Sequence, residues 1–363
     1  MQFIDLKKQY HLIESDILSS IKQVLDHGQY IMGPEIKALE NTLAEFIGVK
    51  HVIANASGTD ALLMALLALD IGPGDEVITS PFSFFATAEV IALCQAKSVF
   101  VDIDPLTYTM DANQLDAAIT PKTKAIMPVS LYGQPADMEK INKIAKKYGL
   151  PVIEDAAQSF GAKQGERYSC SLSTIGCTSF FPSKPLGGYG DSGACFTDED
   201  VLAERLREVR LHGQNARYRH CRIGINGRMD TMQAAILLQK MKLFPEEIEL
   251  RQQVAGRYAD LLSDCVKTPV ILPGNTSIYA QYTIEVPNRD QFQQSMEEYG
   301  IPTAVHYPVA MHQQVALSGL GYSEGDFPHA EAASQRVISL PMHPYLSLEE
   351  QKQIAHAVKQ SLN

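Results

Sequence analysis

One lysine of this sequence stands in surroundings that favour chemistry over solvation. Lys184 lies in the stretch SFFPSKPLGGYGDSG (179–193), which is rich in glycine and hydroxyl groups and contains neighbouring aromatic residues. A cation held away from water has its pKa lowered from an ordinary value of about 10.4. The neutral amine can then attack an aldehyde and form a Schiff base. Although most lysines are solvated surface groups, Lys184 is a candidate for covalent attachment of a carbonyl compound.

A pair of acidic residues precedes this lysine at the end of an apolar run. Glu154 and Asp155 close the run PVIED, and Gln158 follows three residues later. In open α/β sheets, ligands bind outside the carboxyl ends of the strands, and an acid there is costly to bury unless it is paired. The alternative is a cap between strand and helix. The separation of 184 − 155 = 29 residues leaves room for a strand, a turn and a second strand.

A third motif, NASGTD (55–60), lies between a short expected strand and a helix. Gly58 lets the backbone approach a ligand closely, and Thr59 with Asp60 begins the helix. The free N–H groups and the dipole of a helix start suit an anion such as phosphate. Taken alone, the motif is as well explained by a plain helix cap.

Together, the three motifs meet the needs of one cofactor, pyridoxal 5'-phosphate (PLP). PLP requires an anion cradle for its phosphate, an acid beneath its ring nitrogen and a lysine for its aldehyde. At an effective dielectric constant of 20 and a separation of 4 Å, a carboxylate–pyridinium pair is worth about 4 kcal/mol, which keeps the ring electron-withdrawing. We therefore predict a PLP enzyme in which Lys184 carries the cofactor and Asp155 pairs with its ring.

The elements that must position these residues alternate between β-rich and helical stretches. Continuous apolar runs indicate strands buried on both faces, and hence a largely parallel sheet covered by helices. Strands are expected at 52–54, 76–80, 98–104, 124–130, 151–157, 178–183 and 193–197, with helices at 59–69 and 86–94. Helical patterns follow residue 200 and change near Pro273. Beyond it, 279–286, 290–299, 303–308 and 349–360 indicate a small α+β unit.

The expected organisation has three parts. Residues 1–30 form one amphipathic helix that packs on the small domain or on a partner subunit. Residues 31–250 form a large PLP-binding domain, and residues 251–363 form a small C-terminal domain.

Composition excludes several classes of protein. The formal charge of 31 − 42 = −11 argues against nucleic acid as a partner. The first residues lack the pattern of a signal peptide, and the longest apolar run, 61–69, is too short to span a bilayer. Six scattered cysteines show neither CxxC nor metal-ligand spacing, and Cys177 and Cys195 lie in core-like surroundings. We expect a cytoplasmic protein with free thiols and without a metal.

The motifs, in order along the chain, resemble a known family. SGTDAL, EDAAQSFGA, TSFFPSKPLGGYGDSGA and RMDTMQAAIL are similar to the DegT/DnrJ/EryC1/StrS sugar aminotransferases. The resemblance runs from FIDLKKQY (3–10) to SLPMHPYLS (339–347) and implies PLP fold type I, with a mostly parallel sheet between helices and a small C-terminal α+β domain. Within the family, the chain is most similar to enzymes that aminate carbon 3 of a UDP-linked keto-sugar, particularly UDP-2-acetamido-2-deoxy-3-oxo-glucuronate in O-antigen synthesis.

The resemblance implies roles at matching positions. Lys184 would carry the cofactor and move protons in both half-reactions, with glutamate as amino donor. Asp155 would pair with the pyridinium, and Gln158 would approach the phenolic oxygen of PLP. The residues implied for the phosphate are Gly58, Thr59 and Ser179.

Further implied residues lie around the ring and the sugar nucleotide. Phe84 would stack on the ring, although Phe82 and Phe85 are adjacent candidates and Phe84 could be plain core. Asn226 would reach the phosphate of the neighbouring subunit, which makes the protein a homodimer with shared sites. The residues implied for the sugar nucleotide, also from the partner chain, are Arg228, His306 and Tyr307. Alternatives are a surface ion pair for Arg228 and a core histidine for His306.

The sequence also allows other functions. The substrate could instead be a 4-keto sugar or a dTDP-linked 3-keto-6-deoxy sugar. A sister group that removes a hydroxyl has histidine in place of Lys184, so lysine favours amino transfer. A cysteine desulfurase would need a mobile exposed cysteine, for which Cys170 is the one candidate. A regulator that binds PLP without turnover would not need the full set of Asp155, Gln158 and Lys184.

Overall fold

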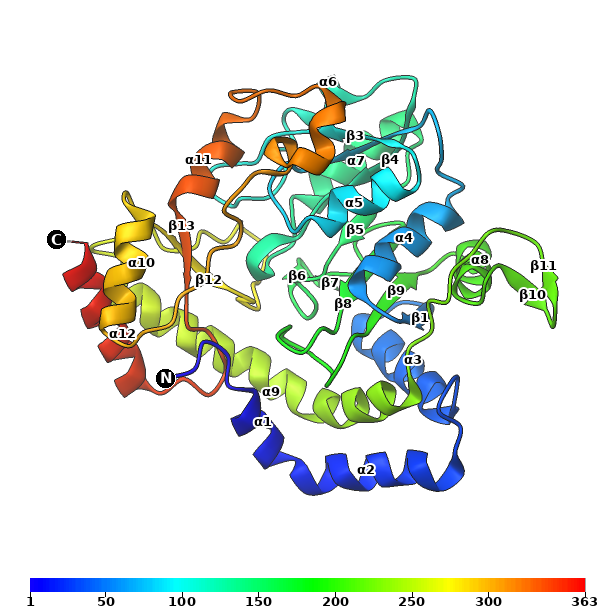
Figure 1. Cartoon of the computed structure of the whole chain (residues 1–363), viewed down its shortest axis with the longest axis horizontal. Helices are drawn as coiled ribbons and strands as arrows, with labels where there is room; N and C mark the ends of the chain where they lie inside the picture. Colours follow the sequence, from blue (N-terminus) through cyan, green and yellow to red (C-terminus); the bar gives the residue numbers. More distant parts are fainter. Residues whose placement is uncertain (363) are drawn as a thin grey trace.

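The computed structural model describes residues 1–362, and its centre is a seven-stranded sheet (Figure 1). Parallel bridges Ile126–Val152 and Val129–Asp155 join two smaller sheets into the order β3-β2-β4-β5-β8-β9-β1. Among these strands only β9 runs against the others, so the mostly parallel sheet is confirmed. In chain order the strands are β1 (His51–Asn55), β2 (Glu76–Thr79), β3 (Lys97–Phe100), β4 (Thr123–Met127), β5 (Ile153–Asp155), β8 (Ile175–Ser179) and β9 (Gly193–Thr197).

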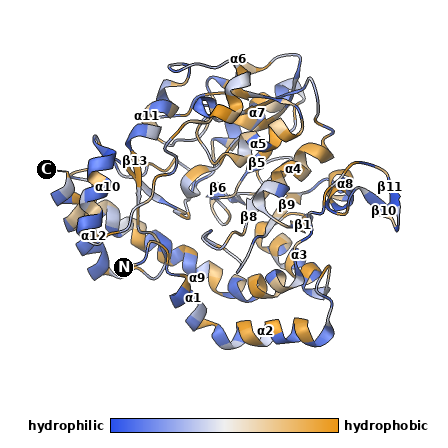
Figure 2. Cartoon of the chain, in the orientation of Figure 1, coloured by the Kyte–Doolittle hydropathy of each residue, from blue (hydrophilic) through white to orange (hydrophobic). Residues whose placement is uncertain are grey.

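Helices cover both faces of the sheet. Along β1, Ile53 contributes to the core beneath one set of helices, whereas Val52 and Ala54 contribute to the core on the opposite face. The predicted core cysteines, Cys177 and Cys195, are both buried in the first of these cores. The first face is covered by α4 (Gly58–Ala68), α5 (Ala86–Leu93) and α8 (Asp200–Arg210), and the second by α3 (Pro34–Ile47) and α9 (Thr231–Leu262). Figure 2 shows the apolar colouring of α4 and α5 beside the sheet.

The long helix α9 connects this sheet to a smaller C-terminal unit. Its first half packs under the large sheet through residues such as Phe244, and its second half enters a separate core through Tyr258. That core also contains an antiparallel pair, β12 (Tyr282–Glu285) and β13 (Val337–Leu340), with α10 (Arg289–Glu298) and α12 (Leu348–Ser361). Residues 303–308 do not form a strand, because their pairing is a single bridge from Ala304 to Ser339.

The N-terminal region differs from its prediction. Two helices, α1 (Leu6–Leu12) and α2 (Glu14–His27), stand where the sequence predicts one, because the chain turns at Ile13 with φ −131° and ψ 22°. Ile17 of α2 packs on Ile236 of α9.

Among residues 1–362, no helix is long and apolar enough to cross a membrane.

Shorter elements complete the chain. One hairpin projects from the body at the right of Figure 1 and is coloured hydrophilic in Figure 2. This hairpin is β10 (Gln214–Ala216) with β11 (Arg219–His220). The others are α6 (Leu115–Ala118), η1 (Leu131–Gly133), α7 (Met138–Tyr148), β6 (Lys163–Gln164), β7 (Arg167–Tyr168), η2 (Met311–Gln313), η3 (Val315–Leu320) and α11 (Pro328–Arg336).

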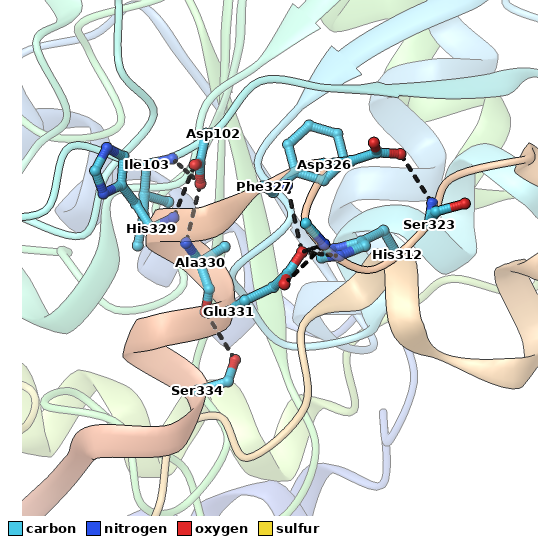
Figure 3. A network of polar contacts seen from close by, with 11 residues as sticks. Asp102, Ile103, His312, Ser323, Asp326, Phe327, His329, Ala330, Glu331 and Ser334 are labelled. Atoms are coloured by element: carbon cyan, nitrogen blue, oxygen red, sulfur yellow. Dashed lines mark hydrogen bonds and ion pairs between the residues drawn. The ribbon is translucent and has the colours of Figure 1, made fainter. Parts of the chain in front are cut away.

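A network of hydrogen bonds holds the segment that contains η2 and α11 against the end of β3 (Figure 3). Asp102, which follows β3, accepts hydrogen bonds from the backbone N–H groups of His329 and Ala330 at the start of α11, both at 3.0 Å. Glu331 of α11 accepts from Nε2 of His312 at 2.9 Å. These hydrogen bonds connect η2 to α11, and α11 to the residue that follows β3. They hold the chain segment before η2 over the carboxyl ends of the strands of the large sheet.

Candidate active site

Asp155 is a buried carboxylate at the end of β5, with 5% of its surface exposed. Its Oδ2 accepts a hydrogen bond from Oγ1 of Thr87 at 2.8 Å, and its Oδ1 accepts from the backbone N–H of Ala157 at 3.2 Å. Burial raises the pKa of Asp155 above its ordinary value, although these two donors and the charge of Lys184 oppose the rise. Each oxygen still has acceptor capacity, so the carboxylate fits a cationic ring nitrogen.

Lys184 lies in a turn after β8, where its backbone N–H donates to the carbonyl oxygen of Phe181 at 2.8 Å. Loss of contact with water lowers the pKa of its amine, and the charge of Asp155 opposes this shift. The two side chains that the sequence analysis pairs are therefore close enough for their charges to interact. Between β5 and Lys184 the chain forms the short hairpin β6–β7 and then β8.

Gln158 bridges two distant parts of the chain. Its Oε1 accepts from the backbone N–H of Tyr132 at 2.8 Å, and its Nε2 donates to the hydroxyl of Tyr307 at 3.0 Å. The pKa of Tyr307 is raised by burial and, to a smaller extent, by the charge of Asp155. Gln158, Asp155 and Tyr307 thus form one cluster.

His306 joins this cluster from the same segment as Tyr307. Burial, helped by the charge of Lys184, lowers the pKa of His306 to about 4, so its ring is neutral at physiological pH. Its Nδ1 lies 3.1 Å from Oγ of Ser339, and its carbonyl oxygen accepts from the hydroxyl of Tyr132. The expectation that His306 and Tyr307 come from a partner chain is wrong, because both lie beside Lys184 and Gln158 of their own chain.

The motif predicted to hold phosphate lies against the end of β8. Helix α4 begins at Gly58, and Oγ of Ser57, the residue before it, accepts from the backbone N–H of Asp60 at 3.0 Å. A Cβ atom on Gly58 would lie 2.6 Å from Cβ of Ser179, so only glycine allows this approach. The first N–H groups of a helix have no partner within it. Gly58, Thr59 and Ser179 therefore lie together, where N–H and hydroxyl groups suit a phosphate.

The aromatic residues before α5 divide between core and surface. Phe82 is buried at 1% exposure, and Phe85 packs against the same core. Phe84 is 58% exposed, and its ring centroid lies 6.2 Å from that of Tyr307. The alternative of plain core is wrong for Phe84, which is the member of the three that can contact a planar ligand next to Tyr307.

Asn226 and Arg228 lie in the segment that follows the hairpin β10–β11. The carbonyl oxygen of Gly227, between them, accepts from the backbone N–H of Ala56 at 3.0 Å, so this segment passes the loop before α4. Asn226 is exposed, and Nε of Arg228 is buried without a hydrogen-bond partner among residues 1–362. Within those residues neither side chain bonds to Asp155, Gln158 or Lys184, and Arg228 forms no ion pair.

The sequence analysis missed two residues of the cluster, Thr87 and Tyr132. Thr87 had a detectable signal, since it is a polar residue among the apolar positions of α5 and lies one helical turn after Phe84. Tyr132 had none, because its contribution to Gln158 is a backbone N–H and its φ of 57° could not be predicted from its side chain.

The comparison of sequences agrees with this geometry. Residues 11–359 match the DegT/DnrJ/EryC1/StrS aminotransferase family. The chain belongs to this family.

Three curated relatives of the family illustrate its range. The chain is 54% identical to UDP-2-acetamido-2-deoxy-3-oxo-D-glucuronate aminotransferase of Pseudomonas aeruginosa, with 99% of each chain covered. It is 45% identical to the pleiotropic regulatory protein of Geobacillus stearothermophilus, covering 98% of this chain and 96% of the relative. It is 41% identical to UDP-N-acetyl-3-dehydro-alpha-D-glucosamine 3-aminotransferase of Acidithiobacillus ferrooxidans, covering 99% and 97%.

Solved structures of family members share the fold. A DegT/DnrJ/EryC1/StrS aminotransferase from Brucella abortus superposes with a TM-score of 0.97 at 44% identity, with both chains fully covered. NtdA from Bacillus subtilis, solved with bound cofactor PMP, superposes with a TM-score of 0.90 at 34% identity, covering 96% of this chain and 81% of that one. PMP is the amino form of PLP, so the predicted cofactor, fold class and aminotransferase activity are confirmed. This family member is a PLP-dependent aminotransferase.

Proposed function

We propose that this aminotransferase moves the amino group of glutamate to carbon 3 of a UDP-linked 3-oxo sugar, with UDP-2-acetamido-2-deoxy-3-oxo-glucuronate as the first candidate. The observation that carries the proposal is 54% identity, over 99% of both chains, to an aminotransferase named for that substrate. A second relative named for a UDP-linked 3-dehydro sugar supports the position of amination. The proposal includes a cytoplasmic location and a product used in cell-surface polysaccharide such as O-antigen.

The lysine cluster supplies the acid–base groups that amino transfer needs. When bound, PLP supplies an electron-withdrawing ring that stabilises negative charge on the carbon next to the substrate nitrogen. Asp155 would hold the protonated ring nitrogen, for which its buried carboxylate has spare acceptor capacity. Nζ of Lys184, whose pKa is lowered by burial, would take the proton from the α-carbon of glutamate. In the second half-reaction it would deliver a proton to carbon 3 of the sugar.

Other residues of the cluster would position the cofactor and substrate. Gln158 would hold the phenolic oxygen, because Tyr132 and Tyr307 fix both ends of its amide. Phe84 would cover the ring from its exposed position beside Tyr307. The phosphate would lie at the start of α4, held by the residues that meet there, namely Gly58, Thr59 and Ser179.

Two of the predicted site residues are candidates for contact with the site of a partner subunit. Asn226 is exposed, and the buried Nε of Arg228 lacks a partner among residues 1–362. We include in the proposal a homodimer in which Asn226 reaches the phosphate of the neighbouring subunit's cofactor and Arg228 approaches its sugar nucleotide. His306, which is neutral and lies beside Lys184, would contact the sugar within its own chain.

Other functions have weaker support. A desulfurase would need a reactive thiol, yet Cys170 is buried at 1% exposure and burial raises its pKa well above the ordinary value. The name of one relative, the pleiotropic regulatory protein, favours a role in regulation without turnover. Against it, a regulator that binds PLP without turnover would not need the complete set of Asp155, Gln158 and Lys184, which this chain brings together.

The substrate can be tested directly. We expect the enzyme, loaded as its PMP form, to regain the absorbance of PLP when mixed with UDP-2-acetamido-2-deoxy-3-oxo-glucuronate. dTDP-linked 3-keto-6-deoxy sugars and 4-keto sugars, offered in parallel, should restore it at least tenfold more slowly. Faster recovery with either of those sugars would contradict the proposed substrate, and recovery with none of them would favour the regulatory role.

A further inference from the structure

Two buried hydroxyl groups, one on Thr87 of α5 and one on Ser83 before the helix, lie in series and end on Asp155. Oγ1 of Thr87 donates to Oδ2 of Asp155 at 2.8 Å, and Oγ of Ser83 lies 3.1 Å from Oγ1 of Thr87. All three residues are buried, with exposed fractions of 1% for Thr87 and 5% for Ser83 and Asp155. The two hydroxyl groups therefore form hydrogen bonds with each other and with the carboxylate, and not with water.

The direction of these hydrogen bonds follows from the chemistry of the acceptor. An ionised carboxylate has no proton to give, so the hydrogen of Thr87 must point at Asp155. The oxygen of Thr87 is then left as an acceptor, and Ser83 must donate to it. Each donor in such a chain polarises the next, and hydrogen bonds to a charged form favour that form. Ser83 and Thr87 together thus stabilise a negative charge on Asp155.

Asp155 needs this support because its surroundings oppose its charge. Burial is the largest influence on its pKa and raises it; of the groups that lower the pKa, the hydrogen bond from Thr87 is the largest, ahead of the backbone of Ala157 and the amine of Lys184. Other titratable groups whose charges interact with Asp155 include Glu154, its neighbour in β5, and Tyr307. Neither of these supplies a positive charge.

We propose that Thr87 is a positioning residue, which keeps Asp155 ionised and oriented for the ring nitrogen of the cofactor, and that Ser83 strengthens its hydrogen bond. The proposal rests on the assignment of Asp155 in the proposed function. Thr87 touches neither cofactor nor substrate in this role. If its hydroxyl is lost, the proton shared between Asp155 and the ring nitrogen moves toward the carboxylate, and the ring becomes less electron-withdrawing.

The test compares Thr87→Val, which keeps the shape but removes the donor, with Thr87→Ser, which keeps the donor. In the holoenzyme loaded with PLP labelled at the ring nitrogen with ¹⁵N, we expect Thr87→Val to move the ¹⁵N chemical shift toward that of an unprotonated pyridine. The rate of the glutamate half-reaction should fall about tenfold, with KM for glutamate unchanged. Thr87→Ser should restore both within about threefold, and Ser83→Ala should show a smaller change in the same direction.

Thr79→Val is the matched control. Thr79 is also fully buried, and its Oγ1 donates to the carbonyl oxygen of Met127 at 2.8 Å instead of to the carboxylate of Asp155. Thr79→Val should lower thermal stability, as Thr87→Val does, but it should leave the ¹⁵N chemical shift unchanged. An unchanged ¹⁵N shift in Thr87→Val, or a Thr87→Ser enzyme as impaired as the valine variant, would overturn the proposal. A wild-type enzyme without amino transfer would instead contradict the proposed function.

Discussion

At the scale of single residues, the site contains two ionisable groups that the fold drives toward their neutral forms. Burial raises the pKa of Asp155 and lowers that of Lys184. In an enzyme without cofactor, each buried charge is a cost to folding. PLP would remove both costs, since it would bind Lys184 covalently and place a cation beside Asp155. The residues that prepare the chemistry are thus also those that make the apoenzyme less stable.

This conflict predicts a stability change for Asp155→Asn in the apoenzyme. A carboxyl group whose pKa is raised by folding stabilises the fold only while it is protonated, and this contribution is lost as pH rises through the raised pKa. At pH 8 the neutral asparagine should therefore increase the free energy of unfolding of the apoenzyme, because no charge has to be buried. The difference should shrink as pH is lowered through the pKa of folded Asp155. Urea unfolding at several pH values measures it.

When PLP is added, the wild type should become more stable than Asp155→Asn. At a concentration 100-fold above Kd, a ligand stabilises the folded form by about 2.7 kcal/mol, and Asp155→Asn should lose most of that gain. Glu154→Gln is a suitable control, because Glu154 is buried next to Asp155 but bonds to Ser130, Ser169 and the backbone of Cys170. If PLP stabilised the asparagine variant as much as the wild type, Asp155 would not be the partner of the ring nitrogen.

The residue scale also shows where sequence reasoning stops. Lys184 and Asp155 could be found because their side chains break an apolar pattern. Tyr132 could not, because it acts through its backbone N–H, and the assignment of Tyr307 to another chain failed because no pattern in one sequence states which subunit a loop folds onto. Contacts between segments 149 residues apart, such as Gln158 with Tyr307, depend on the whole fold.

At the scale of elements, the phosphate position depends on how closely α4 approaches β8. The Cβ of an alanine at position 58 would lie 2.6 Å from Cβ and 3.2 Å from Cα of Ser179, so one backbone must move. Gly58→Ala should cost about 1 to 3 kcal/mol of stability, as overpacking does. It should also weaken PLP binding at least tenfold, measured by titration of the apoenzyme.

A control at another glycine separates this contact from the general effect of a methyl group. Gly72 has open space within 4 Å of an added Cβ and no left-handed backbone angle. Gly72→Ala should leave PLP affinity unchanged. Wild-type affinity in Gly58→Ala would show that the phosphate does not lie between α4 and Ser179.

The elements themselves were predictable to different degrees. Six of the seven strands of the large sheet could be located because both faces are buried, which gives continuous apolar runs between helices. The strand predicted at 178–183 lies earlier, at Ile175–Ser179, and the chain after it forms the turn that contains Lys184. The segment 303–308 reads as a strand but is held by a single bridge at Ala304 and by side-chain contacts of His306 and Tyr307. The turn at Ile13 has no proline or glycine to announce it. Local sequence therefore predicts buried regular elements better than segments fixed by distant partners.

At the scale of the whole molecule, one chain brings together the residues of the lysine cluster. Lys184, Asp155 and Gln158 lie together, whereas Asn226 is exposed. Tyr218, at 81% exposure, lies in the turn of the projecting hairpin β10–β11, and Ile223, at 84%, lies between that hairpin and Asn226. Exposed side chains of this size are available for contact with another protein surface. A second copy of the chain is the partner that would place Asn226 where the phosphate needs it.

Shared sites make a prediction about mixed subunits. Lys184→Ala and Asn226→Ala enzymes should each be nearly inactive for different reasons, the first through loss of the amine and the second through loss of a phosphate contact. In a twofold dimer, a mixed pair has one site with both defects and one site with neither. Random exchange makes half of the dimers mixed, so about one quarter of wild-type activity should return. Activity measured after proven subunit exchange checks this.

Mixing Lys184→Ala with Asp155→Asn gives the matching control, because these two residues lie in one chain's cluster. Every site of that mixed dimer keeps one defect, so activity should not return. Recovery in the control pair alone would place Asp155 and Lys184 in different subunits, against the geometry of the chain. Absence of recovery in both pairs would mean that Asn226 serves the site of its own chain, and the exposed hairpin would then need another partner.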